Sequence, residues 1–497
     1  MEEQRQSFAP WLMSPWVPVV IGCLAYLGAL HGPFVHDDFP QIVNNPYLDS
    51  WSSAPLFFGR NFWVEGWGVS GSATYYRPLF MLWLLICKKL FGMNTVLWHA
   101  SSVALHGVAT FLLFRMTQRL TRSEVAAWVA ALLFAVHPSH VEAVIWLSSS
   151  GDLLGAIAAM AAVLCFLRVA DDARWRRWSV ATAAVFAGAV LSKEALVLFP
   201  IVLVALWWVR GRDRRQLTAS VAAIAVAVAY VALRFALLHT LGAARSQVST
   251  STILLTTPSI LLFYVRQFVA PITLSLFYDS YYVSNVSTAA FIVPVLILLG
   301  IAAAAFFSRK KQPYVAVGLL WALLTIAPTL DLRVFYWREI VHDRYLYIPS
   351  IGLAVVIGVA VAAAAKRWSA PALRMIALTA ALVLAVVTVN QSSYWSSALL
   401  LYSHAVQVAP NNVGANMMIA ETLQARGDLN DAIRFYEHTA MLAPNWPDPE
   451  VSLARLYARA GQRQLAIAHM QRAMQIAPGA PLEREMQALQ APAKQAR

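Results

Sequence analysis

Long apolar runs dominate the first 391 residues, and polar residues gather in the segments between these runs. A helix of about 20 apolar residues matches the hydrocarbon thickness of a bilayer. The pattern therefore predicts an all-α fold, a polytopic membrane helix bundle. Eleven spans are expected near 12–32, 96–114, 125–145, 152–167, 178–192, 194–209, 218–239, 288–307, 313–330, 346–365 and 371–390.

Two further apolar stretches do not fit the pattern of a span. Residues 78–91 are short and contain two lysines, and residues 253–270 are interrupted by Pro258, Arg266 and Pro271. Residues 78–91 are expected to lie along the membrane interface, and residues 253–270 are expected to form an interfacial or re-entrant helix that does not cross the membrane.

Residues 392–497 have a different pattern, with a period of 34 residues. Ala-Pro recurs at 409–410, 443–444 and 477–478, and Gly427 is followed at the same spacing by Gly461. This period is typical of tetratricopeptide repeats, which are helix pairs with a glycine in the turn. Two repeats, 413–446 and 447–480, preceded by one helix at 394–410, predict a short α-solenoid. The expected domains are 1–391, with a long loop at 33–95, and 392–497.

Composition and charge narrow the class of protein. The chain of 497 residues is 59% hydrophobic and only 13% charged, against about 25% charged in soluble domains. These values exclude a soluble enzyme. The three cysteines have no CxxC spacing and predict neither a disulfide framework nor a zinc site.

The net charge of +13 follows the membrane topology. With the N-terminus in the cytoplasm, the cytoplasmic segments contain 18 basic residues and the opposite loops of the membrane domain contain 10. This asymmetry is the positive-inside pattern. It predicts a retained first span, an extracytoplasmic 33–95 loop, extracytoplasmic repeats and no nucleic-acid partner.

Candidate chemistry begins in the 33–95 loop. Asp37 and Asp38 follow His36 directly after the first span. An aspartate at the mouth of a membrane cavity can act as a general base for an alcohol nucleophile. The two carboxylates could instead bind a divalent cation, or belong to a solvated loop without catalytic function. The loop ends with Arg77, whose guanidinium suits a phosphate or snorkels at the interface.

Three other segments combine charged and aromatic residues near the same membrane face. The first, 137–152, reads HPSHVEAVIWLSSSGD and contains His137, His140, Glu142 and Asp152 as candidates to line a binding pocket. Metal binding by the two histidines and a simple polar cluster at a helix end are the alternatives.

Lys193 and Glu194 lie between two apolar runs, where charges are either functional or paired. The third segment surrounds 331–345 and contains Arg338, His342, Arg344 and Tyr345. Its basic residues run against the positive-inside trend. They would bind an anionic lipid headgroup or form salt bridges within the loop.

Taken together, these stretches resemble the transmembrane and tetratricopeptide repeat-containing O-mannosyltransferases. The matching pieces occur in family order: HDD, IVNNP, YYRPL, WHASSVALH, AALLFAVHPSHVEAVIW, SSGDLL, SKEA and DRYLYIPSIG. The sequence departs from the family in having two clear repeats, and in Asn416 and Glu450 at the early aromatic position of each repeat. These departures favour a bacterial relative.

The resemblance implies a type C glycosyltransferase fold and a sugar donor on a lipid phosphate. In a bacterial inner membrane, this carrier would be undecaprenyl phosphate. The sugar, mannose by resemblance, would pass to serine or threonine hydroxyls of an extracytoplasmic polypeptide. Asp37 is the expected general base, with Asp38 orienting it or sharing that role. The expected phosphate ligands are Arg77, Lys193, Arg344 and Arg338.

The other candidates would line the pocket: His36, His137, His140, Glu142, Asp152, Glu194, His342 and Tyr345. No firm cofactor is expected beyond the lipid-linked sugar. A divalent cation, if present, would be bound by Asp37 and Asp38. The repeats would bind the acceptor or a partner. Two other functions remain open: a non-catalytic membrane-anchored scaffold that displays the repeats, and a transporter of lipid-linked glycans.

Overall fold

The computed structural model describes residues 13–59, 75–239, 246–335, 339–367 and 370–490. All regular elements in these ranges are helices. The chain forms two compact units. Unit 1 comprises Met1–Leu274 and Tyr282–Ser396, and unit 2 comprises Ser275–Tyr281 and Ser397–Arg497.

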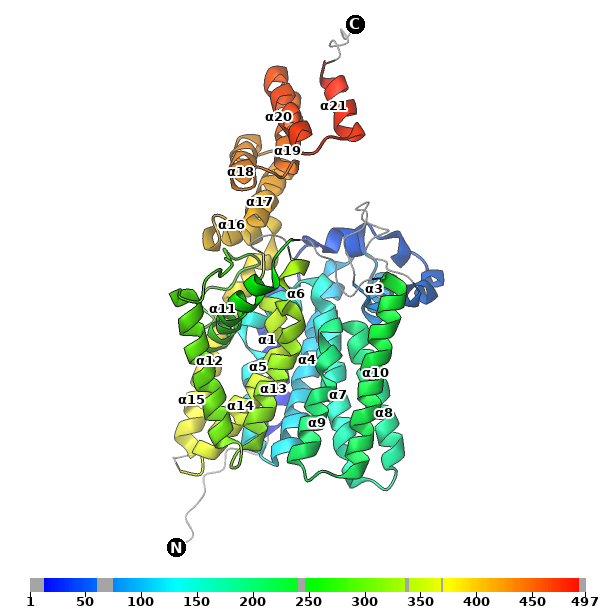
Figure 1. Cartoon of the computed structure of the whole chain (residues 1–497), viewed down its shortest axis with the longest axis vertical. Helices are drawn as coiled ribbons and strands as arrows, with labels where there is room; N and C mark the ends of the chain where they lie inside the picture. The colour runs from blue at the N-terminus through cyan, green and yellow to red at the C-terminus, as the bar shows by residue number, and fades with distance from the viewer. Residues whose placement is uncertain (1–12, 60–74, 240–245, 336–338, 368–369, 491–497) are drawn as a thin grey trace. The chain divides into compact units, whose positions relative to one another are not determined.

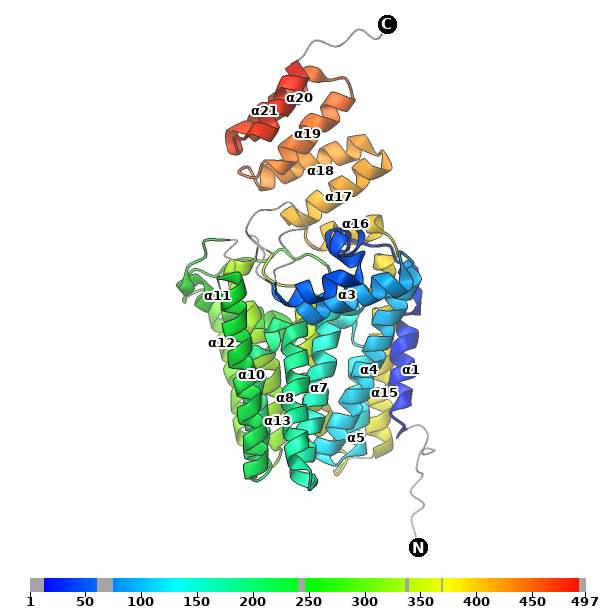
Figure 2. The same cartoon turned by 90° about the vertical axis from the view of Figure 1, so that its right-hand side faces the viewer.

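Unit 1 is a bundle in which most long helices run side by side (Figures 1 and 2). Its α-helices are α1 (Trp16–Ala25), α3 (Pro78–Phe91), α4 (Thr95–Thr121), α5 (Glu124–Ala135), α6 (Val141–Ile145), α7 (Ser150–Asp171), α8 (Trp175–Ser192), α9 (Pro200–Val209), α10 (Arg214–Leu238), α11 (Thr250–Val269), α12 (Ala289–Ser308), α13 (Pro313–Ile326), α14 (Tyr347–Ala364) and α15 (Ala370–Ser393). The long loop after α1 contains short helical turns, among them a π-helical turn at Phe39–Val43.

The expected multi-pass membrane protein is confirmed in its general form. Eight helices in the described ranges are long and apolar enough to cross a membrane, or nine when a bent pair counts as one span. The expected span 12–32 falls on a shorter apolar helix, Trp16–Ala29, and the expected span 194–209 falls on Glu194–Val209. The expected span 178–192 falls on α8, which is not among the eight.

The two stretches expected at the interface form continuous helices. In α11 the helix passes through Pro258 without ending, contrary to the interruption expected there. This helix also meets the length and hydropathy of a span. Both views place α3 and α11 at the same end of the unit 1 bundle (Figures 1 and 2). Their interfacial position stays a prediction.

The expected span 125–145 is broken. Helix α5 and the segment Pro138–Ile145 meet at an angle of 55°. The break lies at His137 and Pro138, because proline has no N–H to continue the helix and disfavours the α conformation of the residue before it. The polar side chains at and after the break, among them His137, His140 and Glu142, are buried.

Glycines allow α13 and α14 to approach closely. A Cβ atom on Gly318 would lie 2.6 Å from the carbonyl oxygen of Gly352, and one on Gly352 would collide with the carbonyl of Gly318. Contact at this distance requires two residues without side chains. This contact fixes α14, which begins just after Arg344, against α13.

Unit 2 is a series of helical hairpins. Its helices are α16 (Ala398–Val408), α17 (Val413–Arg426), α18 (Leu429–Leu442), α19 (Asp448–Arg459), α20 (Arg463–Ile476) and α21 (Ala480–Gln490). The turns after α17 and α19 each contain a glycine with positive φ, 89° at Gly427 and 74° at Gly461. The structure thus gives the 34-residue spacing a physical cause, a left-handed turn that glycine favours. Assignment to the tetratricopeptide class stays a prediction.

A loop segment that is distant in sequence belongs to unit 2. The amide of Asn412 donates to the carbonyl oxygen of Tyr278 at 3.1 Å, and Asp279 accepts from the backbone N–H of Asn411 at 3.3 Å. Phe277 and Tyr278 are buried. Residues 275–281 are therefore part of unit 2. The predicted domain boundary at 391 assigns them instead to the membrane domain.

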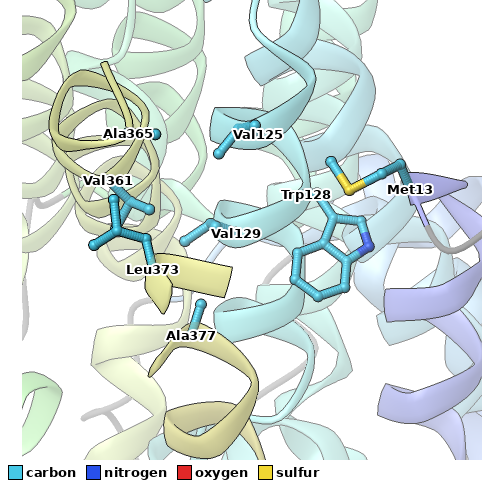
Figure 3. A pocket seen from close by; sticks show the side chains of 8 residues that line it. All are labelled: Met13, Val125, Trp128, Val129, Val361, Ala365, Leu373 and Ala377. Atoms are coloured by element: carbon cyan, nitrogen blue, oxygen red, sulfur yellow. The ribbon is translucent and has the colours of Figure 1, made fainter. Parts of the chain in front are cut away.

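One pocket of unit 1 is wholly apolar in its lining (Figure 3). It lies beside the first two turns of α5, whereas His137 and Glu142 lie beyond the other end of that helix. Its lining contains no carboxylate or cation, so it is not a candidate for the reaction site. The lining residues are Met13, Val125, Trp128, Val129, Val361, Ala365, Leu373 and Ala377.

Candidate functional site

The acidic pair lies in a tight turn after α1. The backbone N–H of Asp38 donates to the carbonyl of Val35 at 2.9 Å. Within this turn, His36 has a φ of 49°, a left-handed conformation that is uncommon for residues other than glycine. Such a conformation persists only when surrounding contacts hold it, and it is found often at functional sites. The turn points the two neighbouring carboxylates to different environments.

Asp38 is fully buried and holds the turn together. One carboxylate oxygen accepts from the backbone N–H of Val35 at 3.1 Å. The other accepts from the backbone N–H and the hydroxyl of Ser148, at 2.9 and 2.6 Å. Burial raises the pKa of Asp38 to about 7, and these hydrogen bonds offset only part of that effect. Asp38 thus connects the acidic loop to the segment before α7.

Asp37 remains accessible. Its side chain is 27% exposed, and its carboxylate lies 2.9 Å from Nδ1 of His36. Burial is the largest single effect on the pKa of His36 and lowers it. The negative charge of Asp37, its hydrogen bond to His36 and the charge of Glu339 together outweigh burial, so the net pKa is raised. The pair is therefore suited to hold and exchange a proton at the protein surface.

Arg344 lies close to the acidic turn. Its guanidinium is paired with Glu142, which also accepts from the Arg344 backbone N–H at 3.1 Å. The guanidinium lies 4.5 Å from the ring centre of Trp146 and 4.8 Å from that of Tyr345. The ring of His36 contacts the same Trp146, edge to face at 5.5 Å. Trp146 therefore lies against both His36 and Arg344.

Two more buried ion pairs involve the other predicted cations. Lys193 Nζ lies 2.7 Å from Asp152, and Arg77 binds Glu194 through two hydrogen bonds of 2.5 Å. Lys193 also lies 5.7 Å from the ring centre of Tyr345. Tyr345 thus contacts both Arg344 and Lys193. The structure brings these three cations into one region, each beside a carboxylate.

The remaining predicted residues have other surroundings. His137 and His140 are buried and bound to backbone carbonyls, of Phe268 at 2.9 Å and of Phe134 at 2.9 Å. His342 is buried and packs edge to face on Tyr345 at 5.3 Å. Arg338 lies outside the described residues. In the ranges that the structure describes, no three His, Cys, Asp or Glu side chains are grouped to hold a metal ion.

Three residues of this region are not among the predicted site residues. Ser148 binds Asp38, Trp146 packs against His36 and Arg344, and Arg234 of α10 lies within electrostatic range of Glu194. The sequence contains part of the information needed to find them. Ser148 and Trp146 lie in the quoted 137–152 motif, and Arg234 is a charge inside an apolar helix, which is costly in a membrane.

Comparison with known proteins finds similarity to protein O-mannosyltransferases. Residues 76–237 match the family model described as dolichyl-phosphate-mannose-protein mannosyltransferase. The chain is 27% identical to human protein O-mannosyl-transferase TMTC1 over 82% of its own length and 53% of that protein. It is 24% identical to the Caenorhabditis elegans protein O-mannosyl-transferase F38B6.6, over 83% of its own length and 60% of the relative. The chain thus spans little more than half the length of these relatives.

A solved structure is also similar. ArnT from Cupriavidus metallidurans, bound to undecaprenyl phosphate, shares 15% sequence identity and a TM-score of 0.38, with 90% of this chain and 81% of that chain covered. A likeness this distant supports no statement about ligand or reaction. The sequence relatives carry the conclusion: the predicted resemblance is confirmed, and the chain is homologous to the transmembrane and tetratricopeptide repeat-containing O-mannosyltransferases.

Proposed function

We propose that this protein is a type C membrane glycosyltransferase. It moves a sugar, mannose, from a polyprenyl-phosphate donor to a serine or threonine hydroxyl of an extracytoplasmic polypeptide. The observation that carries the proposal is the division of the acidic pair. Asp38 is buried in structural hydrogen bonds, whereas Asp37 is accessible and lies near Arg344. Homology to protein O-mannosyltransferases supports the reaction class.

The residues account for each part of the transfer. The acceptor hydroxyl attacks the anomeric carbon, and its proton passes to the Asp37 carboxylate. The bond between the anomeric carbon and the phosphate oxygen breaks, and its electron pair leaves with the polyprenyl phosphate. The phosphate gains a negative charge, which nearby cations stabilise. Arg344 is the proposed residue for this role, because it interacts electrostatically with Asp37.

The ion pairs prepare the cations for this task. An arginine or lysine that a carboxylate already orients does not have to be ordered when the donor binds. Glu142 orients Arg344, Glu194 orients Arg77, and Asp152 orients Lys193. Glu142, Asp152 and Glu194 thus act on the phosphate side, rather than on the acceptor. A phosphate that contacts one of these cations competes with the carboxylate already paired with it. The leaving polyprenyl phosphate carries more negative charge than the donor, so it competes better than the donor does.

We propose that the two substrates lie on one side of a bacterial inner membrane. The excess of 18 over 10 basic residues supports a cytoplasmic N-terminus and an acidic loop outside. Undecaprenyl phosphate is the proposed carrier. The helical hairpins of unit 2, as tetratricopeptide repeats, would hold an extended acceptor polypeptide.

Transfer by the purified full-length protein tests the proposal. Radiolabelled polyprenyl-phosphate sugars, mannose first, are incubated with the protein and a serine- and threonine-rich polypeptide, with and without EDTA. We expect label in the polypeptide from the mannosyl donor. Absence of transfer from all donors would contradict the proposal and favour a scaffold. Loss of transfer in EDTA would assign a divalent cation to the reaction.

A further inference from the structure

The broken helix between α5 and α6 leaves three backbone carbonyls without their regular partners. In an unbroken helix, the carbonyls of Phe134, Ala135 and Val136 would accept from the N–H groups four residues later. Pro138 has no N–H. The N–H of Ser139 donates instead to Nδ1 of His137 at 3.3 Å, and that of His140 to the carbonyl of His137 at 3.0 Å.

Three side chains donate to these carbonyls, and the Phe134 carbonyl also accepts from the backbone N–H of His137 at 3.4 Å. His140 Nδ1 lies 2.9 Å from the Phe134 carbonyl, and His106 Nε2 of α4 lies 3.0 Å from the Ala135 carbonyl. The hydroxyl of Thr388 in α15 donates to the Val136 carbonyl at 2.7 Å. Since unsatisfied backbone carbonyls inside a membrane protein are costly, all three contacts stabilise the break. A carbonyl only accepts, so His106 carries a proton on Nε2 and His140 on Nδ1.

The two histidines also contact α14, whereas the hydroxyl of Thr388 has no hydrogen bond to α14 among the described residues. His106 Nδ1 accepts from the hydroxyl of Tyr347 at 2.9 Å. His140 Nε2 lies 2.8 Å from the hydroxyl of Ser350, whose one hydrogen it shares with the Tyr347 carbonyl at 2.6 Å. Each imidazole therefore joins the broken helix to the first turn of α14 with its second nitrogen. His106, His140 and Ser350 are buried.

These contacts lie close in sequence to both members of the Glu142–Arg344 pair. Glu142 is the second residue of α6, two residues after His140, and Arg344 lies three residues before Tyr347. We infer that His106 and His140 are positioning residues, which fix the distance between these two segments. They keep the guanidinium of Arg344 in place for a lipid-linked phosphate. This role rests on the proposed function of Arg344.

The variants for the test differ in whether they remove a contact with α14 or a cap on a backbone carbonyl. Tyr347→Phe and Ser350→Ala each remove the α14 side of a histidine contact and leave the capped carbonyl in place. Thr388→Val removes a carbonyl cap that has no such link, so it is the matched control. Binding of undecaprenyl phosphate to the detergent-solubilised full chain is measured with thermal unfolding of the same samples.

We expect Tyr347→Phe and Ser350→Ala to weaken lipid-phosphate binding by about fivefold or more, as expected for residues coupled through one hydrogen-bonded network. Thr388→Val should lower the unfolding temperature and leave binding within about twofold of the parent protein. If all three variants bind as the parent does, the histidines stabilise the fold only and the inference is wrong.

A second measurement separates this inference from the proposed function. The unfolding temperatures of Glu142→Gln, Arg344→Gln and the double variant give the coupling of the ion pair without any substrate. This coupling should decrease in the Tyr347→Phe background and persist in the Thr388→Val background. If the parent protein does not bind the lipid phosphate, the proposed function fails, but the coupling still decides the positioning role. Equal coupling in both backgrounds would overturn it.

Discussion

The two neighbouring aspartates allow a stringent test, because the same substitution should have different effects at each. In Asp38→Asn, the amide oxygen can replace the carboxylate oxygen that accepts from Ser148. The amide nitrogen then faces the backbone N–H of Val35, which loses its acceptor. A buried donor without a partner costs about 1–3 kcal/mol.

Asp37→Asn changes an accessible side chain and should leave the stability of the fold nearly unchanged. Thermal unfolding of both variants in one detergent measures the difference, with transfer assayed in parallel. We expect Asp38→Asn to unfold at a lower temperature than the parent protein and Asp37→Asn to unfold with it. Equal unfolding temperatures for the two variants would refute the division of roles.

Three further predictions concern other parts of unit 1. Because the pKa of Asp38 rises from an ordinary 3.8 to about 7 on folding, the folded state binds a proton more tightly than the unfolded state. Loss of this proton should make the protein less stable as pH rises from about 4 to 7, with a smaller slope in Asp38→Asn under thermal unfolding. Lys88 donates to the carbonyls that end the π-helical turn, at 2.8 and 3.3 Å, so Lys88→Met should loosen the acidic loop and speed its cleavage in limited proteolysis. Gly352→Ala would collide with the carbonyl of Gly318 and should cost about 1–3 kcal/mol in denaturant unfolding, whereas Gly300→Ala, with open space around it, should cost little.

The sequence predicts the helical membrane architecture well, because the length of an apolar run is a local property that the bilayer thickness determines. Helices α4, α7 and α10 lie where the runs predict them. The expected span 125–145 is broken at His137–Pro138, although the proline is visible in the sequence. Which side chains replace the lost hydrogen bonds depends on α4 and α15, which are distant in sequence, and no local pattern contains that information.

The site was predicted as a set of residues but not as a set of contacts. Lys193 and Glu194 are adjacent and of opposite charge, so the sequence suggests that they pair with each other. In the structure, Lys193 pairs with Asp152 and Glu194 pairs with Arg77. The second pair is separated by 117 residues. Such pairings depend on helix packing, so residue type and spacing cannot give them. The sequence also could not say which aspartate is buried, since that depends on Ser148.

Sugar transfer by Asp37→Asn, compared with Asp49→Asn, tests the central claim most directly. Asp49 lies in the same loop, and its side chain is 67% exposed. With polyprenyl-phosphate mannose as donor, the assignment of Asp37 as general base predicts that Asp37→Asn loses transfer by about 100-fold or more, while it unfolds at the parent temperature. Asp49→Asn should transfer at the parent rate. Transfer by Asp37→Asn at the rate of Asp49→Asn would contradict the account.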